Sequence, residues 1–98
     1  MFTAIMRFHF KDEHFDRGCA IWLETVPDAA QRQKGCVQIQ FLSSRPYALA
    51  IGTWQKADDA QVFMKTGIFD RLLSLLGDTL AEQPEPSAWT TLYTSTGR

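Results

Sequence analysis

Along the first ten residues, apolar side chains at every second position alternate with side chains of mixed character. The apolar side carries Phe2, Ala4, Met6, Phe8 and Phe10, and the mixed side carries Thr3, Ile5, Arg7 and His9. A period of two residues is typical of a β-strand, and the apolar side is the one expected to pack against helices. The pattern therefore predicts a strand over residues 2–10.

A helical period follows this strand. The apolar positions at helical spacing are Phe15, Cys19, Trp22, Leu23 and Val26. Asp12, just before them, has a side chain suited to an N-cap. Pro27 is expected to interrupt the helix, because proline lacks an N–H and clashes with the preceding turn. Residues 28–33 can add one more turn, for which Gly35 would supply a left-handed C-cap.

Two further alternating segments, residues 36–42 and 47–54, predict the second and third strands. In the first of them Val37, Ile39 and Phe41 share one face. The segments are joined by a short polar turn over residues 43–46. A short connection between two strands favours an antiparallel hairpin.

A second helix and a fourth strand complete the pattern. Asp58 and Gln61 have capping-box spacing, and Gly67 is expected to break or kink the helix that they begin. The strongest helical periodicity in the chain then runs through Phe69, Leu72, Leu73, Leu76 and Leu80. The proline-containing segment 83–86 is expected to end this helix, and residues 89–94 are expected to form the fourth strand.

The order strand–helix–strand–strand–helix–strand predicts an α+β fold of the ferredoxin-like βαββαβ type. Such a fold has a four-stranded antiparallel sheet with both helices on one face. Residues 1–98 are expected to form a single domain. The uncovered face, with Arg7 and His9, either faces water in a monomer or packs against the same face of a second copy. The homodimer is favoured, because isologous two-fold dimers are the commonest assembly.

Composition narrows the class of partner. The 98 residues are 45% hydrophobic and 21% charged with a net charge of −1, so no basic excess points to nucleic acid or to an anionic membrane. Since no apolar run approaches the roughly 20 residues of a membrane span and the N-terminus lacks a signal-peptide pattern, a cytoplasmic location is expected. Cys19 and Cys36 are expected to be reduced thiols. His9 and His14 lie outside any cluster of ligand-type residues, so no metal site is expected.

Four segments resemble the antibiotic biosynthesis monooxygenase-like domains, and together they cover nearly the whole chain. They are GCVQIQF, YALAIGTW with Trp54 at its end, KADDAQVFMKTGIF and LLSLLGDTL. The stress-responsive α/β-barrel proteins share the same architecture. The resemblance implies a dimeric α/β barrel, in which two ferredoxin-like units pack sheet to sheet and each keeps a pocket between its helices and its sheet. Some members of the family oxidise polyketide-like aromatics with neither metal nor flavin, and others degrade haem.

The sequence departs from the haem-degrading members of that family. Those members resemble one another in an Asn on the first strand and in a His early in the second helix, where Phe63 and Met64 stand here. This chain contains no Asn and has no His after His14. The resemblance therefore implies neither haem nor another cofactor.

Six residues are candidates for a site, and each also has a structural interpretation. His9 is a weak candidate for a catalytic base, or else an interface histidine bonded to a neighbour. Arg7 can clamp an anion or a carboxylate on a ligand, or pair with a carboxylate across a dimer. The candidates for contact with an apolar ligand are Trp22, Trp54, Met64 and Phe69, for which core packing is the favoured structural interpretation.

Two classes of function stay open. The first is a small cytoplasmic homodimer that binds an apolar or aromatic small molecule; if it is an enzyme, the resemblance implies cofactor-independent oxygenation. The second is a non-catalytic binding or assembly domain, or a stress-responsive barrel whose role is structural. The sequence contains neither a nucleophile motif nor a phosphate-binding glycine loop, so it identifies no substrate.

Overall fold

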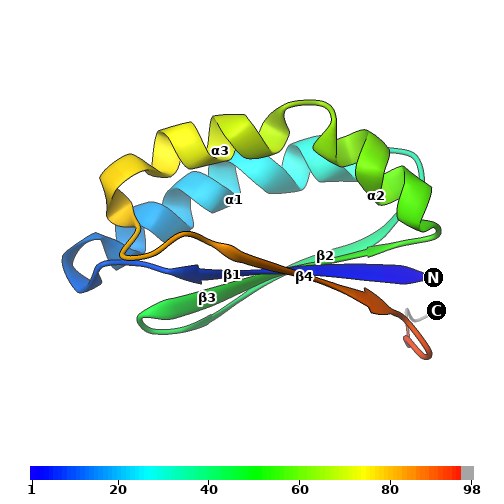
Figure 1. Cartoon of the computed structure of the whole chain (residues 1–98), viewed down its shortest axis with the longest axis horizontal. Coiled ribbons are helices and arrows are strands. Elements are labelled where there is room, and N and C mark those ends of the chain that lie inside the picture. Colours follow the sequence, from blue (N-terminus) through cyan, green and yellow to red (C-terminus); the bar gives the residue numbers. More distant parts are fainter. Residues whose placement is uncertain (96–98) are drawn as a thin grey trace.

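The computed structural model describes residues 1–95. Its elements are β1 (Phe2–His9), η1 (Asp12–His14), α1 (Phe15–Gln31), β2 (Cys36–Ser44), β3 (Tyr47–Trp54), α2 (Ala57–Met64), α3 (Ile68–Leu76), η2 (Gly77–Thr79) and β4 (Glu85–Thr90), where η denotes a short 3-10 helix. The strands form one antiparallel sheet in the order β2-β3-β1-β4. All of the α-helices lie on one face of this sheet (Figure 1). The ferredoxin-like α+β fold predicted from the sequence is confirmed.

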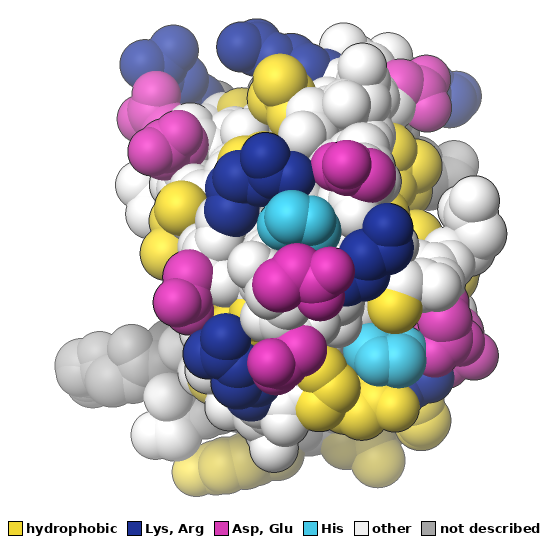
Figure 2. Space-filling view, turned by 90° about the vertical axis from the view of Figure 1, so that its left-hand side faces the viewer, with side chains coloured by type: hydrophobic (Ala, Val, Ile, Leu, Met, Phe, Trp, Pro, Cys, Tyr) yellow, Lys and Arg dark blue, Asp and Glu magenta, His cyan; other side chains and the backbone are white. Residues whose placement is uncertain are grey.

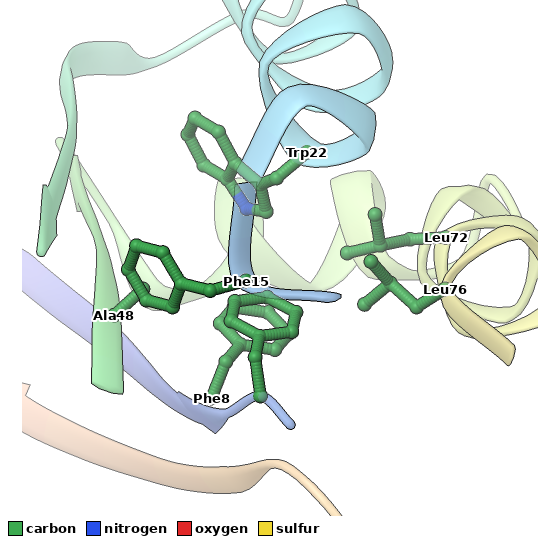
Figure 3. Close-up of a cluster of buried hydrophobic side chains, with 7 residues drawn as sticks. Phe8, Phe15, Trp22, Ala48, Leu72 and Leu76 are labelled. Carbon is green, nitrogen blue, oxygen red and sulfur yellow. The ribbon is translucent and has the colours of Figure 1, made fainter. Parts of the chain in front are cut away.

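The core lies between α1, α3 and the central strands. Phe8 of β1, on the side predicted to be apolar, is 1% exposed. Trp22 of α1 stacks on Phe41 of β2, with ring centroids 4.1 Å apart and ring planes within 9° of each other. Figure 3 shows Phe8 and Trp22 with Leu72 and Leu76, which reach the same cluster from α3. The apolar side chains of β1 and those of α1 therefore pack together in one cluster.

The first helix differs from the prediction in its second half. α1 continues through Pro27 to Gln31, because the residues beyond the proline still bury apolar surface and Ala30 is fully enclosed. This burial outweighs the one backbone hydrogen bond that Pro27 cannot make. Leu23, predicted on the apolar face, is 57% exposed instead. Gly35 has a positive φ of 85° but precedes β2, whereas the C-cap of α1 is Arg32. Measured over residues 1–95, no helix reaches the length and apolarity that crossing a membrane requires.

Neither of the two predicted N-caps is used. Asp12 lies in η1, and the N-cap of α1 is His14, which makes no capping hydrogen bond with its side chain. The capping box expected at Asp58 is also absent, because the N-cap of α2 is Lys56, two residues earlier. Both helices instead begin where packing against the sheet places them, with acidic residues in the first turn that favour the helix dipole.

The predicted second helix consists of two helices. The break expected at Gly67 is confirmed: this residue has a φ of 86° and is the N-cap of α3. α3 ends at Leu76 rather than running on to Leu80, because Gly77 also takes a positive φ, which L-residues with a side chain rarely adopt. Leu80 still packs against the core from outside the helix. It forms an isolated bridge with Phe10, just beyond the end of β1.

The fourth strand begins and ends earlier than predicted. β4 spans Glu85–Thr90 instead of residues 89–94. It includes Pro86, which lies opposite Met6 of β1. Proline is tolerated there because β4 is an edge strand, which pairs on one side only.

Candidate functional site

A cavity of about 400 Å³ lies between the helices and the inner face of the sheet. This volume is within the range of roughly 300–1,000 Å³ that small-molecule sites occupy. Its aromatic lining comprises Phe2, Phe8, Trp22, Trp54, Phe63 and Phe69. All four strands contribute to its floor, while α1, α2 and α3 form its roof. The core cluster of Figure 3 adjoins it, because Phe8, Trp22 and Leu72 belong to both.

The floor of the cavity is made by small residues that the strand register places side by side. Gly52 of β3 lies opposite Ala4 of β1, which in turn lies opposite Ala88 of β4. In the next row Ala50 lies opposite Met6. Since cross-strand partners point to the same face, the inner face is low here, and space is left between it and the helices above.

Trp54 stands at one end of this floor. Its side chain is buried, with 2% exposure, and its ring is 5.3 Å from the ring of Phe63. The indole Nε1 lies 3.1 Å from the point where a Cβ on Gly52 would sit, so the absence of a side chain at Gly52 leaves the N–H facing the cavity. Within residues 1–95, the indole of Trp89 donates to Ser87 Oγ, whereas no such bond is found for Trp54. Trp54 therefore offers the cavity a hydrogen-bond donor.

No charged or titratable side chain of residues 1–95 lines the cavity. Of the two polar residues at the cavity, Gln61 lies on α2, and Ser87 of β4 lies opposite Ile5, so its side chain points to the other face of the sheet. An ionised ligand group inside would lose its hydration without gaining a counter-charge, which is strongly unfavourable. The arrangement suits an uncharged apolar molecule, and it provides no general base within the cavity.

The structure divides the six candidate residues into two groups. Trp22, Trp54, Met64 and Phe69 all line the cavity. Arg7 and His9 point away from it, because along β1 they alternate with the residues that face the helices. A ligand in the cavity is therefore separated from both of these side chains by the sheet.

Arg7 and His9 each have a partner on the other face of the sheet. Arg7 Nε donates to Glu85 Oε1 at 3.3 Å, and its guanidinium lies 4.8 Å from the centre of the Tyr47 ring. His9 Nδ1 is paired with Glu82, and its ring is 4.6 Å from that of Tyr47. These contacts occupy both side chains within the chain itself.

Charged side chains of both signs lie at one end of the molecule. Figure 2 shows this end, where side chains of both signs surround the two histidines. Arg45, for example, reaches Asp12 at 3.2 Å and Asp16 at 3.5 Å. All of these side chains are half or more exposed, so the pairs contribute little to stability. This end of the molecule therefore differs from the cavity, which no charged side chain of residues 1–95 lines.

The small residues of the floor are the part of the site that sequence reasoning missed. The third strand carries them at every second position, as Ala48, Ala50 and Gly52. The period of two predicts that they share a face, but only the register shows that they meet Ala4 and Ala88 in one row. A signal was present in the strand itself, because small residues on a core-facing side leave volume that something must fill.

The sheet face away from the helices, which we call the open face, is uncovered (Figure 1). Its centre carries Ile5 of β1 opposite Ile51 of β3, both half-buried, with Leu49 next to them. Its two edges carry exposed apolar side chains, Leu42 on β2 at 46% and Trp89 on β4 at 57%. An apolar centre flanked by exposed apolar edges is unusual for a face in permanent contact with water.

Comparison with known proteins identifies the fold. No family model matches the sequence, and no curated protein matches it either. Solved structures match over almost the whole chain. One is a candidate antibiotic biosynthesis monooxygenase from Nitrosomonas europaea, with a TM-score of 0.84 and 16% identity over 95% of this chain and 100% of that chain. The chain has the fold of the antibiotic biosynthesis monooxygenases.

Two more structures with this fold agree. An antibiotic biosynthesis monooxygenase matches with a TM-score of 0.79 and 16% identity, over 95% of this chain and 100% of that chain. A variant of SnoaB, a cofactor-independent oxygenase from Streptomyces nogalater, matches with a TM-score of 0.77 and 20% identity, over 95% of this chain and 94% of that chain. Identities of this size show a shared fold, and what the site binds follows from its own residues.

Proposed function

We propose that this chain is an antibiotic biosynthesis monooxygenase-like protein that binds an uncharged apolar or aromatic small molecule between its helices and its sheet. The observation that carries the proposal is the cavity of about 400 Å³, lined by six aromatic side chains and by no charged one within residues 1–95. Natural cores are packed nearly without voids. A volume of this size on the inner face of the sheet is therefore best explained by a ligand.

Trp54 gives the proposed ligand an orientation. The indole N–H of Trp54 has no acceptor among residues 1–95 and faces the cavity, so a ligand oxygen can accept a hydrogen bond from it. The aromatic walls favour flat rings, which stack on or pack edge-on against Trp and Phe side chains. The ligand that fits best is an uncharged ring system with a carbonyl-type or sulfonyl-type oxygen directed at Trp54.

A fluorescence titration tests the proposal. Dansyl amide is an uncharged naphthalene with acceptor oxygens, and its emission strengthens and shifts to the blue in apolar surroundings. We expect saturable binding to the parent protein. Met64→Glu places a carboxylate beside the cavity at a side chain that is already 46% exposed, and should weaken the affinity by about tenfold or more.

The matched control is Val62→Glu. Val62 lies on the same helix and is 59% exposed, but it does not line the cavity, so this variant should bind dansyl amide like the parent. Equal losses in Met64→Glu and Val62→Glu would mean that the probe does not occupy the cavity. Absence of binding to the parent would contradict the proposed function.

Cofactor-independent oxygenation is the second candidate, and the likeness to SnoaB favours it. In such a reaction a base removes a proton from the substrate and the resulting carbanion reacts with dioxygen. The lining of the cavity holds no base, and His9 lies on the other side of the sheet. These placements favour binding over catalysis.

Oxygen consumption distinguishes the two functions. The parent protein, His9→Gln and Trp54→Phe are incubated with quinol-type aromatics in an oxygen electrode. We expect no consumption above the rate without protein. Turnover by the parent that is lost in either variant would establish the oxygenase and overturn the binding-only proposal.

We further propose that two copies pack through their open faces in the cytoplasm, forming the barrel that the sequence resemblance implies. The support is the apolar centre and edges of the open face. The charged side chains on this face are already paired, Arg7 with Glu85 and His9 with Glu82. A partner would then not have to bury a charge without a counter-charge.

A further inference from the structure

The cavity is closed on one side and open on another. At its inner end Trp54 is 2% exposed and Phe63 is 8% exposed. Along β4, in contrast, all six residues are exposed, including Pro86 and Ala88, which line the cavity. β4 is also an edge strand, so no further strand of residues 1–95 pairs with its outer side. The cavity therefore opens along the β4 edge of the sheet.

The floor leads from the closed end to this opening. Gly52, Ala4 and Ala88 lie in one row across β3, β1 and β4. Strands are about 4.8 Å apart, so this row spans roughly 10 Å at right angles to the strands. None of the three side chains is larger than a methyl group, and the row forms a low path from beneath Trp54 to solvent.

The roof also ends at the opening. Met64 of α2 is 46% exposed while it lines the cavity, and Gln61, one helical turn before it, is exposed as well. Met64 has a flexible thioether side chain that adapts to differently shaped groups. Gln61 can hydrogen-bond to a polar group as that group leaves the cavity.

We infer that this cavity is a slot that holds the ring system of its ligand and leaves a substituent of that ligand in solvent at the β4 edge. The class of ligand is thus an uncharged ring system whose attached group can be large, polar or charged. The ring end lies toward Trp54 and the substituent passes between Ala88 and Met64. This inference rests on the proposed binding function and adds the direction of the ligand and the tolerance for its outer end.

Two probes that differ only in their outer end test the inference. The first is dansyl amide, and the second carries a polyethylene glycol chain in place of one methyl group on the 5-amino nitrogen, at the far end of the naphthalene from the sulfonyl oxygens; this chain is too large for a volume of about 400 Å³. We expect the parent protein to bind both with dissociation constants within about threefold of each other. Free polyethylene glycol at the same concentration is the control and should not displace either probe.

The outcomes distinguish a failure of the inference from a failure of the proposed function. If dansyl amide binds and the conjugate does not, the cavity is closed around its ligand and the inference is wrong, although the proposed function stands. If neither probe binds, both fail.

A pair of variants locates the opening. Ala88→Phe places a large side chain on the β4 edge of the slot, and it should weaken binding of the conjugate at least about tenfold more than binding of dansyl amide. Thr90→Phe is the control: Thr90 lies on the same strand and the same face, opposite Phe2, but does not line the cavity. It should affect neither probe. Equal losses for both probes in Ala88→Phe would mean that the substituent does not leave past β4, and would overturn the proposed direction.

Discussion

At the scale of single residues, Thr79 shows what an unpaired polar atom costs. Its side chain is 0% exposed, and its Oγ1 has no hydrogen-bond partner in the described part of the chain. Replacing an enclosed, unsatisfied hydroxyl by a methyl group removes a desolvation cost without creating a cavity. We expect Thr79→Val to raise the free energy of unfolding by about 1 kcal/mol, measured by urea denaturation.

Thr66→Val is the control with the opposite sign. Thr66 Oγ1 donates to the carbonyl of Phe63 at 2.6 Å, in the segment that joins α2 to α3. Removing this donor should lower the free energy of unfolding by about 1 kcal/mol. The interpretation of Thr79 fails if both variants change stability in the same direction.

The two thiols give a prediction about pH. Burial raises the pKa of Cys19, with a smaller contribution from Asp16, and burial also raises the pKa of Cys36. Since the thiolate is the reactive form, a raised pKa leaves less of it at a given pH. Alkylation by iodoacetamide should therefore rise with pH later in the folded protein than in the protein unfolded in urea, followed by mass spectrometry. Coincident pH profiles for the two states would contradict this expectation.

At the scale of elements, the contact between α1 and the segment that follows β1 depends on a glycine. A Cβ on Gly18 would lie 2.4 Å from the Phe10 ring, and that ring is 1% exposed and packed on Phe15. Alanine normally stabilises a helix relative to glycine by about 1 kcal/mol. Here we expect Gly18→Ala to destabilise the protein by about 1–3 kcal/mol, because the buried ring has little room to move. Thermal unfolding followed by circular dichroism measures the change.

The exposed Ala20 on the same helix supplies the comparison. Ala20→Gly should cost about 1 kcal/mol through helix propensity alone. A stabilising effect of Gly18→Ala would contradict the close contact between α1 and the Phe10 ring.

The sequence predicts the bounds of a helix or strand correctly where one hydrophobic period defines it. The second hairpin strand over residues 47–54 agrees with β3 at both ends, since alternation and a turn define it locally. The predictions at Pro27 and Pro86 are wrong because packing, and not the local pattern, decides the structure there. α1 continues past Pro27 because Ala30 is buried, and β4 includes Pro86 because it is an edge strand. Both outcomes depend on tertiary neighbours that no local pattern contains.

The candidate site was predictable to the same extent. Large aromatic side chains at core-facing positions, such as Trp22 and Trp54, pointed to the cavity wall from their periodicity. The floor depends on Gly52 and Ala88 meeting Ala4, and such a meeting is a matter of register between strands distant in sequence. The same alternation placed Arg7 and His9 on the opposite face, so the sequence contained the reason for separating them from the cavity.

At the scale of the whole molecule, the two faces of the sheet differ in structure. The inner face holds the cavity, and the open face carries apolar side chains that nothing covers within residues 1–95. Stable protein interfaces bury about 1,200–2,000 Å² in total, which a four-stranded sheet face can supply. We therefore expect sedimentation at micromolar concentration to give twice the chain mass of 11.1 kDa.

A matched pair of double variants tests which face is used. Leu42→Lys combined with Trp89→Lys places two charges on the edges of the open face, at side chains 46% and 57% exposed. Leu75→Lys combined with Val62→Lys changes two side chains on the helical side, 49% and 59% exposed. Because burying an unpaired ammonium at an interface is costly, the first variant should sediment as a monomer and the second as the parent dimer. A parent protein that sediments at 11.1 kDa, or a dimer that survives only in the first variant, would show that the open face is not the interface.

Titration of the monomeric variant with dansyl amide tests whether the cavity binds the probe without the partner. Because the cavity is lined within one chain, we expect its affinity for dansyl amide to be unchanged.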